Sequence, residues 1–267
     1  MTNITTDLRQ AALDCLIITD PLTKVEQTQS LYQRWLAKEL HITNQQLTVP
    51  DVAGHPDKPE LVAPKDLPRR RNNAETGVAT LIHAVNHIEF NAINLALDAV
   101  ARFADMPEQF YDDWMRVAFE ESQHFVLLRE HLLSLGYDYG DFPAHSGMWD
   151  MAKKTHGDVL KRMALVPRVL EARGLDVTPK MMNKLRGSGD HRAVEILEII
   201  LQEEIGHVAI GTHWFNYLCK KRNLDPLATF KELLDTYFDG GLRGPFHVEA
   251  RMQAGFTEQE MALLEGR

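Results

Sequence analysis

Two copies of one short motif carry the residues best suited to chemistry. The first copy reads Glu120-Glu121-Ser-Gln-His124 and the second reads Glu203-Glu204-Ile-Gly-His207, so both are Glu-Glu-x-x-His. Residues three apart on a helix lie on one face, about one turn apart. A carboxylate and an imidazole in this spacing can therefore bind one metal ion together. A single Glu-x-x-His motif is common on solvated helix faces. The prediction of a metal site therefore rests on the occurrence of the motif twice.

Each motif is preceded by an isolated glutamate at nearly the same distance. Glu89 lies 32 positions before Glu121, and Glu171 lies 33 positions before Glu204. One Glu from each of two helices, with Glu-x-x-His from each of two others, is the ligand set of dimetal carboxylate bundles. The sequence therefore predicts a site for two metal ions whose six protein ligands are Glu89, Glu121, His124, Glu171, Glu204 and His207.

Apolar periodicity separates these ligands from their neighbours. Glu121 and His124 interrupt a stripe of apolar residues at helical spacing, whereas Glu120 falls on a polar face. The second motif shows the same pattern, which favours Glu204 over Glu203. An unpaired buried carboxylate costs several kcal/mol or is neutralised. Two divalent cations would compensate four such carboxylates within an apolar core.

The elements that must position these residues are helices, because strand patterns are nearly absent. Proline-rich residues 41–72 read as an irregular linker. Helices are expected in two segments over residues 6–40, broken near Asp20-Pro21, then at 74–104, 105–135, 148–173, 190–219 and 226–238, and after Thr257.

Loop lengths indicate how the four long helices connect. The first two are joined by a very short turn and should be antiparallel neighbours. The loop over 136–147 could span about 40 Å, roughly the length of a 28-residue helix. Such a crossover is typical of ferritin-like bundles, although a simple up-down bundle also fits the length. We predict an all-α, ferritin-like four-helix bundle (73–220) with N-terminal helices and linker (1–72) and a C-terminal helical extension (221–267).

Local signals refine the helix ends. Asp105-Met-Pro-Glu108 has the pattern of a capping box, so Asp105 is expected to cap the second long helix. Gly174 is expected to end the third, and Thr178-Pro179 to start a short connector helix. Pro167 should kink the third helix one turn before Glu171.

Three histidines outside the motifs are not expected to bind metal. His83 and His87 form an i, i+4 pair on the first long helix, pointing away from Glu89. We expect them at the surface or behind the ligands. His191, near the start of the fourth long helix, is expected in solvent.

Composition excludes several classes of protein. The 267 residues are 44% hydrophobic and 25% charged, with a net charge of −9. That balance argues against broad binding to nucleic acid or anionic membranes. Cys15 and Cys219 are too distant in sequence for a cysteine-rich zinc site or a disulfide framework. We expect no membrane span and no signal peptide, and hence a cytoplasmic protein.

The ligand segments resemble a known family over about residues 70–240. His-Ile-Glu89-Phe-Asn-Ala-Ile, Glu-Glu-Ser-Gln-His124, Leu-Glu171-Ala-Arg-Gly and Glu-Glu-Ile-Gly-His207 are similar to a ferritin-like family described as a domain of unknown function. Its relatives include the non-haem di-iron tRNA hydroxylase acting on a methylthio-isopentenyl-adenosine, whose third-helix ligand also sits in a Glu-Ala-Arg context. The resemblance implies two iron ions, or a manganese/iron pair, on the six predicted ligands, with Glu121 and Glu204 bridging.

The leading hypothesis is an O₂-activating oxygenase or oxidase acting on an unidentified small molecule, with an electron-donor protein as partner. One alternative is a ferroxidase or iron-storage subunit. The extensions flanking the bundle suit a monomeric or dimeric enzyme better than a shell. A second alternative is a tRNA-modifying hydroxylase, for which Arg69–Arg71, Arg162, Arg168 and Arg173 could form a local basic face. The last alternative is a structural helical bundle whose site has lost its metal.

Overall fold

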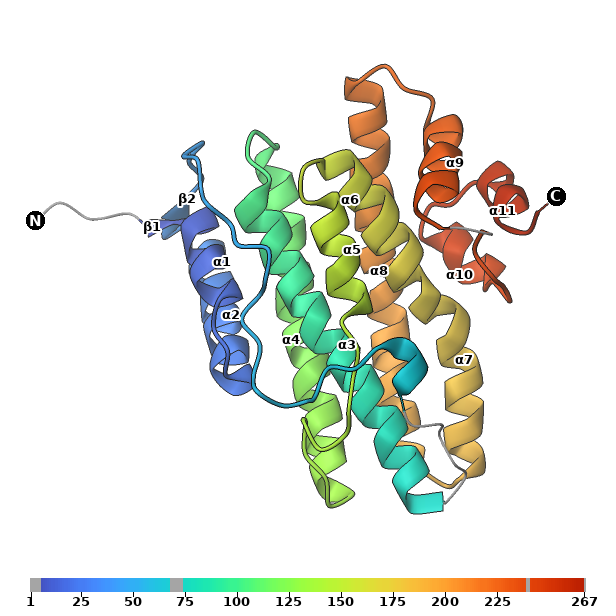
Figure 1. The fold of residues 1–267 in the computed structure, drawn as a ribbon. Helices are drawn as coiled ribbons and strands as arrows, with labels where there is room; N and C mark the ends of the chain where they lie inside the picture. The colour runs from blue at the N-terminus through green and yellow to red at the C-terminus, as the bar shows by residue number, and fades with distance from the viewer. Residues whose placement is uncertain (1–5, 68–73, 239–240, 267) are drawn as a thin grey trace, which may run out of the picture. The chain divides into compact units, whose positions relative to one another are not determined.

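The computed structural model describes residues 6–67, 74–238 and 241–266 of the chain (Figure 1). These residues form helices joined by loops, and two-residue strands β1 (Thr6–Asp7) and β2 (Leu40–His41) pair in parallel. The predicted all-α class is confirmed. The chain divides into two compact units, residues 1–150 and 151–267. The division at residues 72 and 220 stays a prediction.

The first unit is built on a pair of long helices. Its elements after β1 and β2 are α1 (Leu8–Leu16), α2 (Pro21–Leu36), the short 3₁₀ turn η1 (Pro64–Asp66), α3 (Ala74–Arg102), α4 (Glu108–Ser134) and the start of α5 (Gly147–Thr155). The predicted break before Pro21 is confirmed, because the Asp20 carboxylate accepts a hydrogen bond from Thr23 N and caps α2.

Helices α3 and α4 pack along their lengths as an antiparallel hairpin, with α1 against α3 and α2 against α4 (Figure 1). The predicted cap by Asp105 is wrong. Pro107 precedes α4 with no side-chain cap, and Asp105 has a φ of 60°. An N-cap needs extended backbone, so the left-handed Asp105 serves the turn between the helices instead.

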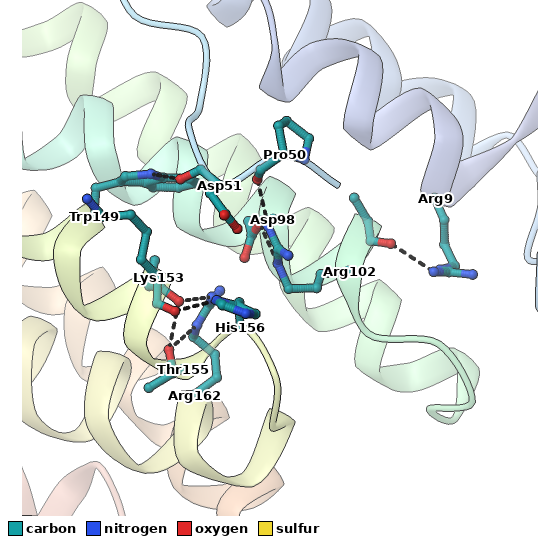
Figure 2. Close-up of polar contacts among 12 residues, drawn as sticks. Arg9, Pro50, Asp51, Asp98, Arg102, Trp149, Lys153, Thr155, His156 and Arg162 are labelled. Atoms are coloured by element: carbon teal, nitrogen blue, oxygen red, sulfur yellow. Dashed lines mark hydrogen bonds and ion pairs between the residues drawn. The ribbon is translucent and has the colours of Figure 1, made fainter. Parts of the chain in front are cut away.

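The linker before α3 is irregular, as expected, and polar contacts hold it in place (Figure 2). Arg102 of α3 forms an ion pair with Asp98 at 2.8 Å and donates to Pro50 O at 2.9 Å. Trp149 Nε1 donates to Asp51 O at 2.8 Å. Arg69–Arg71 lie outside the described residues.

The second unit contains the remaining helices. After α5 these are α6 (Val159–Leu165), the π-helical segment η2 (Val166–Glu171), α7 (Ala172–Gly187), α8 (His191–Lys221), α9 (Pro226–Tyr237), α10 (Val248–Gln253) and α11 (Glu258–Leu264). The predicted starts of α8 and α11 are confirmed. Asp190 accepts from Ala193 N, and Thr257 forms a capping box with Glu260.

The single helix predicted over 148–173 is wrong in its middle and at its C-terminal end. It is interrupted between α5 and α6, where Arg162 donates to Thr155 Oγ1 and Ala152 O at the end of α5 (Figure 2). It also does not stop at Gly174, since α7 continues through Gly174 and Pro179. The predicted connector helix is therefore part of α7. Burial of one face of α7 against α8 outweighs the propensity cost of about 1 kcal/mol for a helical glycine.

Candidate metal centre

The hairpin of α3 and α4 brings together three of the predicted ligands. His124 Nδ1 lies 3.3 Å from Glu89 Oε2 and 3.2 Å from Glu121 Oε2. One ligand atom from each residue lies within 4.8 Å of the other two. All three side chains are buried. The cluster could hold a metal ion.

Helix periodicity decides which glutamate of the first motif belongs to this cluster. Glu121 is completely buried, whereas Glu120 is only half-buried. Glu121 lies three residues before His124, so both project from the same face of α4 toward Glu89 of α3.

The electrostatics of the cluster favour a bound cation. Burial and the neighbouring Glu121 carboxylate raise the pKa of Glu89 to about 8, against the lowering effect of its contact with His124. Two carboxylates in a dry interior repel each other, and each loses its hydration. A divalent cation would offset both the repulsion between the carboxylates and their loss of hydration. Carboxylate oxygen and imidazole nitrogen are donors that suit first-row transition metals.

The second motif places two more predicted ligands on α8 in the second unit. Glu204 Oε1 lies 3.5 Å from His207 Nδ1, and both side chains are buried. Glu203 is half-buried, as the apolar stripe indicated. The other oxygen of Glu204, Oε2, is buried and has no hydrogen-bond partner among the described residues. A carboxylate oxygen in that state costs several kcal/mol unless a cation or donor reaches it.

Glu171 is the buried last residue of η2, and η2 packs against α8. Pro167 lacks an N–H and its ring clashes with the carbonyl one turn back, so the helix widens into π geometry. The kink predicted at Pro167 is thus a π-helical segment. Because the helix continues into α7, Glu171 lies inside a longer helical run and not at its end.

A glycine on α8 allows this widened segment to approach. A Cβ atom built on Gly211 would lie 2.3 Å from Pro167 Cγ and 2.4 Å from Pro167 Cβ. Only glycine fits at that contact. Gly211 follows His207 by one helical turn, so the close approach lies beside the second motif.

His83 and His87 are buried, which excludes the surface, one of the two positions that we expected for them. His83 Nε2 accepts a hydrogen bond from Gly140 N at 2.9 Å, and His87 Nδ1 hydrogen-bonds with Tyr139 Oη at 2.9 Å. Burial lowers the pKa of both imidazoles to about 4, so both are neutral at pH 7. They hold the loop after α4 against α3. His191 is exposed, as predicted.

The Tyr139 ring covers residues next to two predicted ligands. Its centroid lies 5.5 Å from that of Phe90 and 5.1 Å from that of Phe125. Phe90 follows Glu89, and Phe125 follows His124. Local sequence patterns do not reveal this packing, because Tyr139 lies in a loop far along the chain.

Asn86 is a further buried polar residue near the cluster, and no sequence motif indicated it. It is fully buried three residues before Glu89, and neither Oδ1 nor Nδ2 of its amide has a hydrogen-bond partner among the described residues. The spacing of three places both residues on one side of α3. A buried amide with open donor and acceptor atoms is suited to bind a polar group.

The arginines considered for a basic face have different positions. Arg162 and Arg168 are buried, whereas Arg173 is 44% exposed. Buried guanidinium groups cannot contact a nucleic-acid backbone at the surface. Among the described residues, no helix is long and apolar enough to cross a membrane.

Comparisons with known proteins agree with the sequence resemblance in one respect, because they identify a family of unknown function. A family model described as "Protein of unknown function (DUF455)" matches residues 17–262. An "Uncharacterized protein" of Haemophilus influenzae is 47% identical over 272 residues, which cover 98% of this chain and 94% of that protein. No solved structure matches the chain.

Proposed function

Because the chain belongs to the DUF455 family, whose description gives no function, we propose a function from the site itself. We propose that the chain is a ferritin-like dimetal carboxylate protein that uses O₂ to oxidise a small molecule. One ion would be held by the cluster of Glu89, Glu121 and His124 in the first unit. The other ion would be held by Glu171, Glu204 and His207 in the second unit.

The single observation that carries this proposal is the buried cluster around His124. Its two carboxylates are buried, and both lie beside the His124 imidazole. The buried Glu204–His207 pair repeats the same chemistry on α8. Four carboxylates balance the charge of two divalent cations, and one histidine for each ion matches the donor set of dimetal bundles.

The donor set favours iron, as an Fe/Fe or Mn/Fe pair. Six protein ligands for two ions leave coordination positions open for O₂ and substrate. When bound, such a pair supplies the redox chemistry that the side chains lack.

The chain's own residues would bind and shield the substrate. The open amide of Asn86 would hydrogen-bond a polar group of the bound molecule, which fixes its orientation next to Glu89. Phe90, Phe125 and Tyr139 would exclude water from the side of the cluster that faces the loop after α4.

Partners follow from the chemistry and the charge. Oxygenase turnover requires electrons, so an electron-donor protein is part of the proposal. The net charge of −9 and the burial of Arg162 and Arg168 favour a small molecule over tRNA as the substrate. We propose a monomeric or dimeric protein in the cytoplasm.

The test is the reaction of anaerobically Fe(II)-loaded protein with O₂. We expect two Fe(II) to be oxidised per chain and the reaction then to stop until a reductant is added. A ferroxidase would instead oxidise many equivalents of Fe(II) per chain and elute from a size-exclusion column as a large shell. Protein that binds iron but does not react with O₂ would contradict the proposed oxidation chemistry.

A further inference from the structure

The segment that carries Glu171 is anchored on its N-terminal side by a buried arginine. Arg168 precedes Glu171 by three residues and is completely inaccessible to solvent. Its Nη2 atom lies 2.5 Å from Glu260 Oε1 of α11, and its Nε donates to Thr212 Oγ1 of α8 at 3.3 Å. The ion pair joins η2 to a helix 92 positions further along the chain.

Three aromatic rings surround the Arg168 guanidinium. Its Cζ atom lies 4.6 Å from the ring centroid of Phe215, 4.2 Å from that of Phe230 and 4.6 Å from that of Phe256. Nη1 has no hydrogen-bond acceptor among the described residues, so the electron-rich ring faces take the place of an acceptor. This arrangement requires a planar cation.

A second buried arginine anchors the C-terminal side. Asp176, five residues after Glu171, accepts hydrogen bonds from Arg251 Nε at 2.9 Å and from Arg251 Nη2 at 2.8 Å. The same Nη2 atom donates to the carbonyl of Ala172, the residue directly after Glu171, at 3.3 Å. His247 N also donates to Asp176, at 2.8 Å.

Phe256 connects the two anchors. Its ring centroid lies 4.6 Å from the Cζ of Arg168 and 5.1 Å from the Cζ of Arg251. Gly255 turns the chain before it with a φ of +87°, and a Cβ there would lie 3.2 Å from Thr212 Cγ2. The backbone thus needs glycine to bring Phe256 between the arginines.

We infer that residues 246–260, here called the C-terminal clamp, position Glu171 for metal binding through Arg168 and Asp176. The inference rests on the proposed function, in which Glu171 is a ligand. A π-helical segment is intrinsically less stable than an α-helix, so outside contacts must hold its conformation. Metal ligands must also be held to within about 0.5 Å of the productive geometry. Arg168 is accordingly a positioning residue.

Cobalt(II) alone, titrated into the metal-free full-length chain, tests the inference by its visible absorption bands. The test variant is Arg168→Lys, which keeps the positive charge but loses the planar guanidinium group and its forked hydrogen-bond donors. The control is Arg162→Lys, because Arg162 is also buried but donates to Thr155 and Ala152 at the end of α5. Unfolding midpoints of the metal-free proteins are measured beside each titration.

We expect wild-type protein to bind two Co(II) per chain. Arg168→Lys should weaken one of the two by about tenfold or more, the usual effect of losing a residue that orients a ligand, and should change its absorption bands. Arg162→Lys should lower the unfolding midpoint and leave both affinities unchanged. If Arg168→Lys does not fold, Phe256→Leu serves instead, since it keeps both charges and removes only the shared ring.

Three different results would overturn the inference. If wild type binds two Co(II) and the Arg168 or Phe256 variant binds both with unchanged affinity and spectrum, the clamp does not position Glu171, while the proposed dimetal function stands. If Arg162→Lys weakens binding as much as Arg168→Lys does, the effect is general destabilisation. Wild type that binds no Co(II) would defeat the dimetal function and this inference with it.

Discussion

His124 of α4 lies with its Nδ1 atom 3.3 Å from Oε2 of Glu89 on α3. This contact joins residues 35 positions apart in the chain and occurs at the level of Glu121. It shows that the register of the α3–α4 hairpin brings the isolated glutamate to the first Glu-x-x-His motif. A shift of either helix by one residue would rotate a ligand out of the cluster by about 100°.

Replacing Glu121 should abolish metal binding at the first cluster. Glu121→Ala removes a buried carboxylate that lies next to both Glu89 and His124, so we expect at most one metal ion per chain and loss of O₂ reactivity. Metal content by plasma mass spectrometry measures this. Glu120→Ala is the matched control, because it removes the adjacent half-buried carboxylate and should keep the wild-type content. Full metal content in Glu121→Ala would remove Glu121 from the site.

Gly211→Ala should damage both stability and metal binding. The added methyl group would lie 2.3 Å from Pro167 Cγ, so η2 must move away from α8 and carry Glu171 with it. Overpacking of this kind typically costs about 1–3 kcal/mol, which urea unfolding would detect.

Gly206→Ala provides the control on the same helix. Among the described residues, and apart from the chain neighbours of Gly206 and the backbone of its own helix, no atom lies within 4 Å of a Cβ built there, so the substitution should leave metal binding intact. It should stabilise the protein by up to about 1 kcal/mol through helix propensity. Equal effects of the two substitutions would mean that the contact of Gly211 with Pro167 does not position Glu171.

The buried imidazole of His83 predicts a loss of stability in acid. Its pKa is lowered by burial from 6.5 to about 4, with the nearby Asp141 carboxylate acting in the opposite direction. Between those pH values the unfolded chain binds a proton that the folded chain does not. His83 therefore contributes a loss of stability as the pH falls from 6.5 toward 4, by at most about 1.4 kcal/mol per pH unit.

His83→Gln tests this contribution, because the amide oxygen can still accept the hydrogen bond from Gly140 N but does not titrate near neutrality. The difference in unfolding free energy between pH 7 and pH 5, measured in urea, should be smaller in His83→Gln than in wild type. Exposed His191→Gln is the control and should leave the difference unchanged. An unchanged pH dependence in His83→Gln would contradict the assignment.

Helical periodicity was sufficient to distinguish the buried members of both motifs. Glu121 and Glu204 are buried and Glu120 and Glu203 are not, because a 3.6-residue repeat ties each side chain to one face. The starts of α2, α8 and α11 were also predictable, since Asp20, Asp190 and Thr257 act locally through their own side chains.

Features that depend on distant parts of the chain were not predictable. Gly174 suggests a helix end, but packing of α7 on α8 keeps the helix intact. The partner of His83 lies 57 positions away at Gly140, so no local pattern shows that the imidazole is buried. The same holds for Arg168 and Glu260, 92 positions apart, whose ion pair anchors the segment before Glu171.

The most direct test of the account is the metal content of protein purified from cells supplied with both iron and manganese. We predict about two metal ions per chain by plasma mass spectrometry, either two iron or one iron and one manganese. Circular dichroism on the same sample establishes that the helices are folded. Folded protein without metal would contradict the central claim, because the buried carboxylates would then be stable without the cations for which their arrangement is suited.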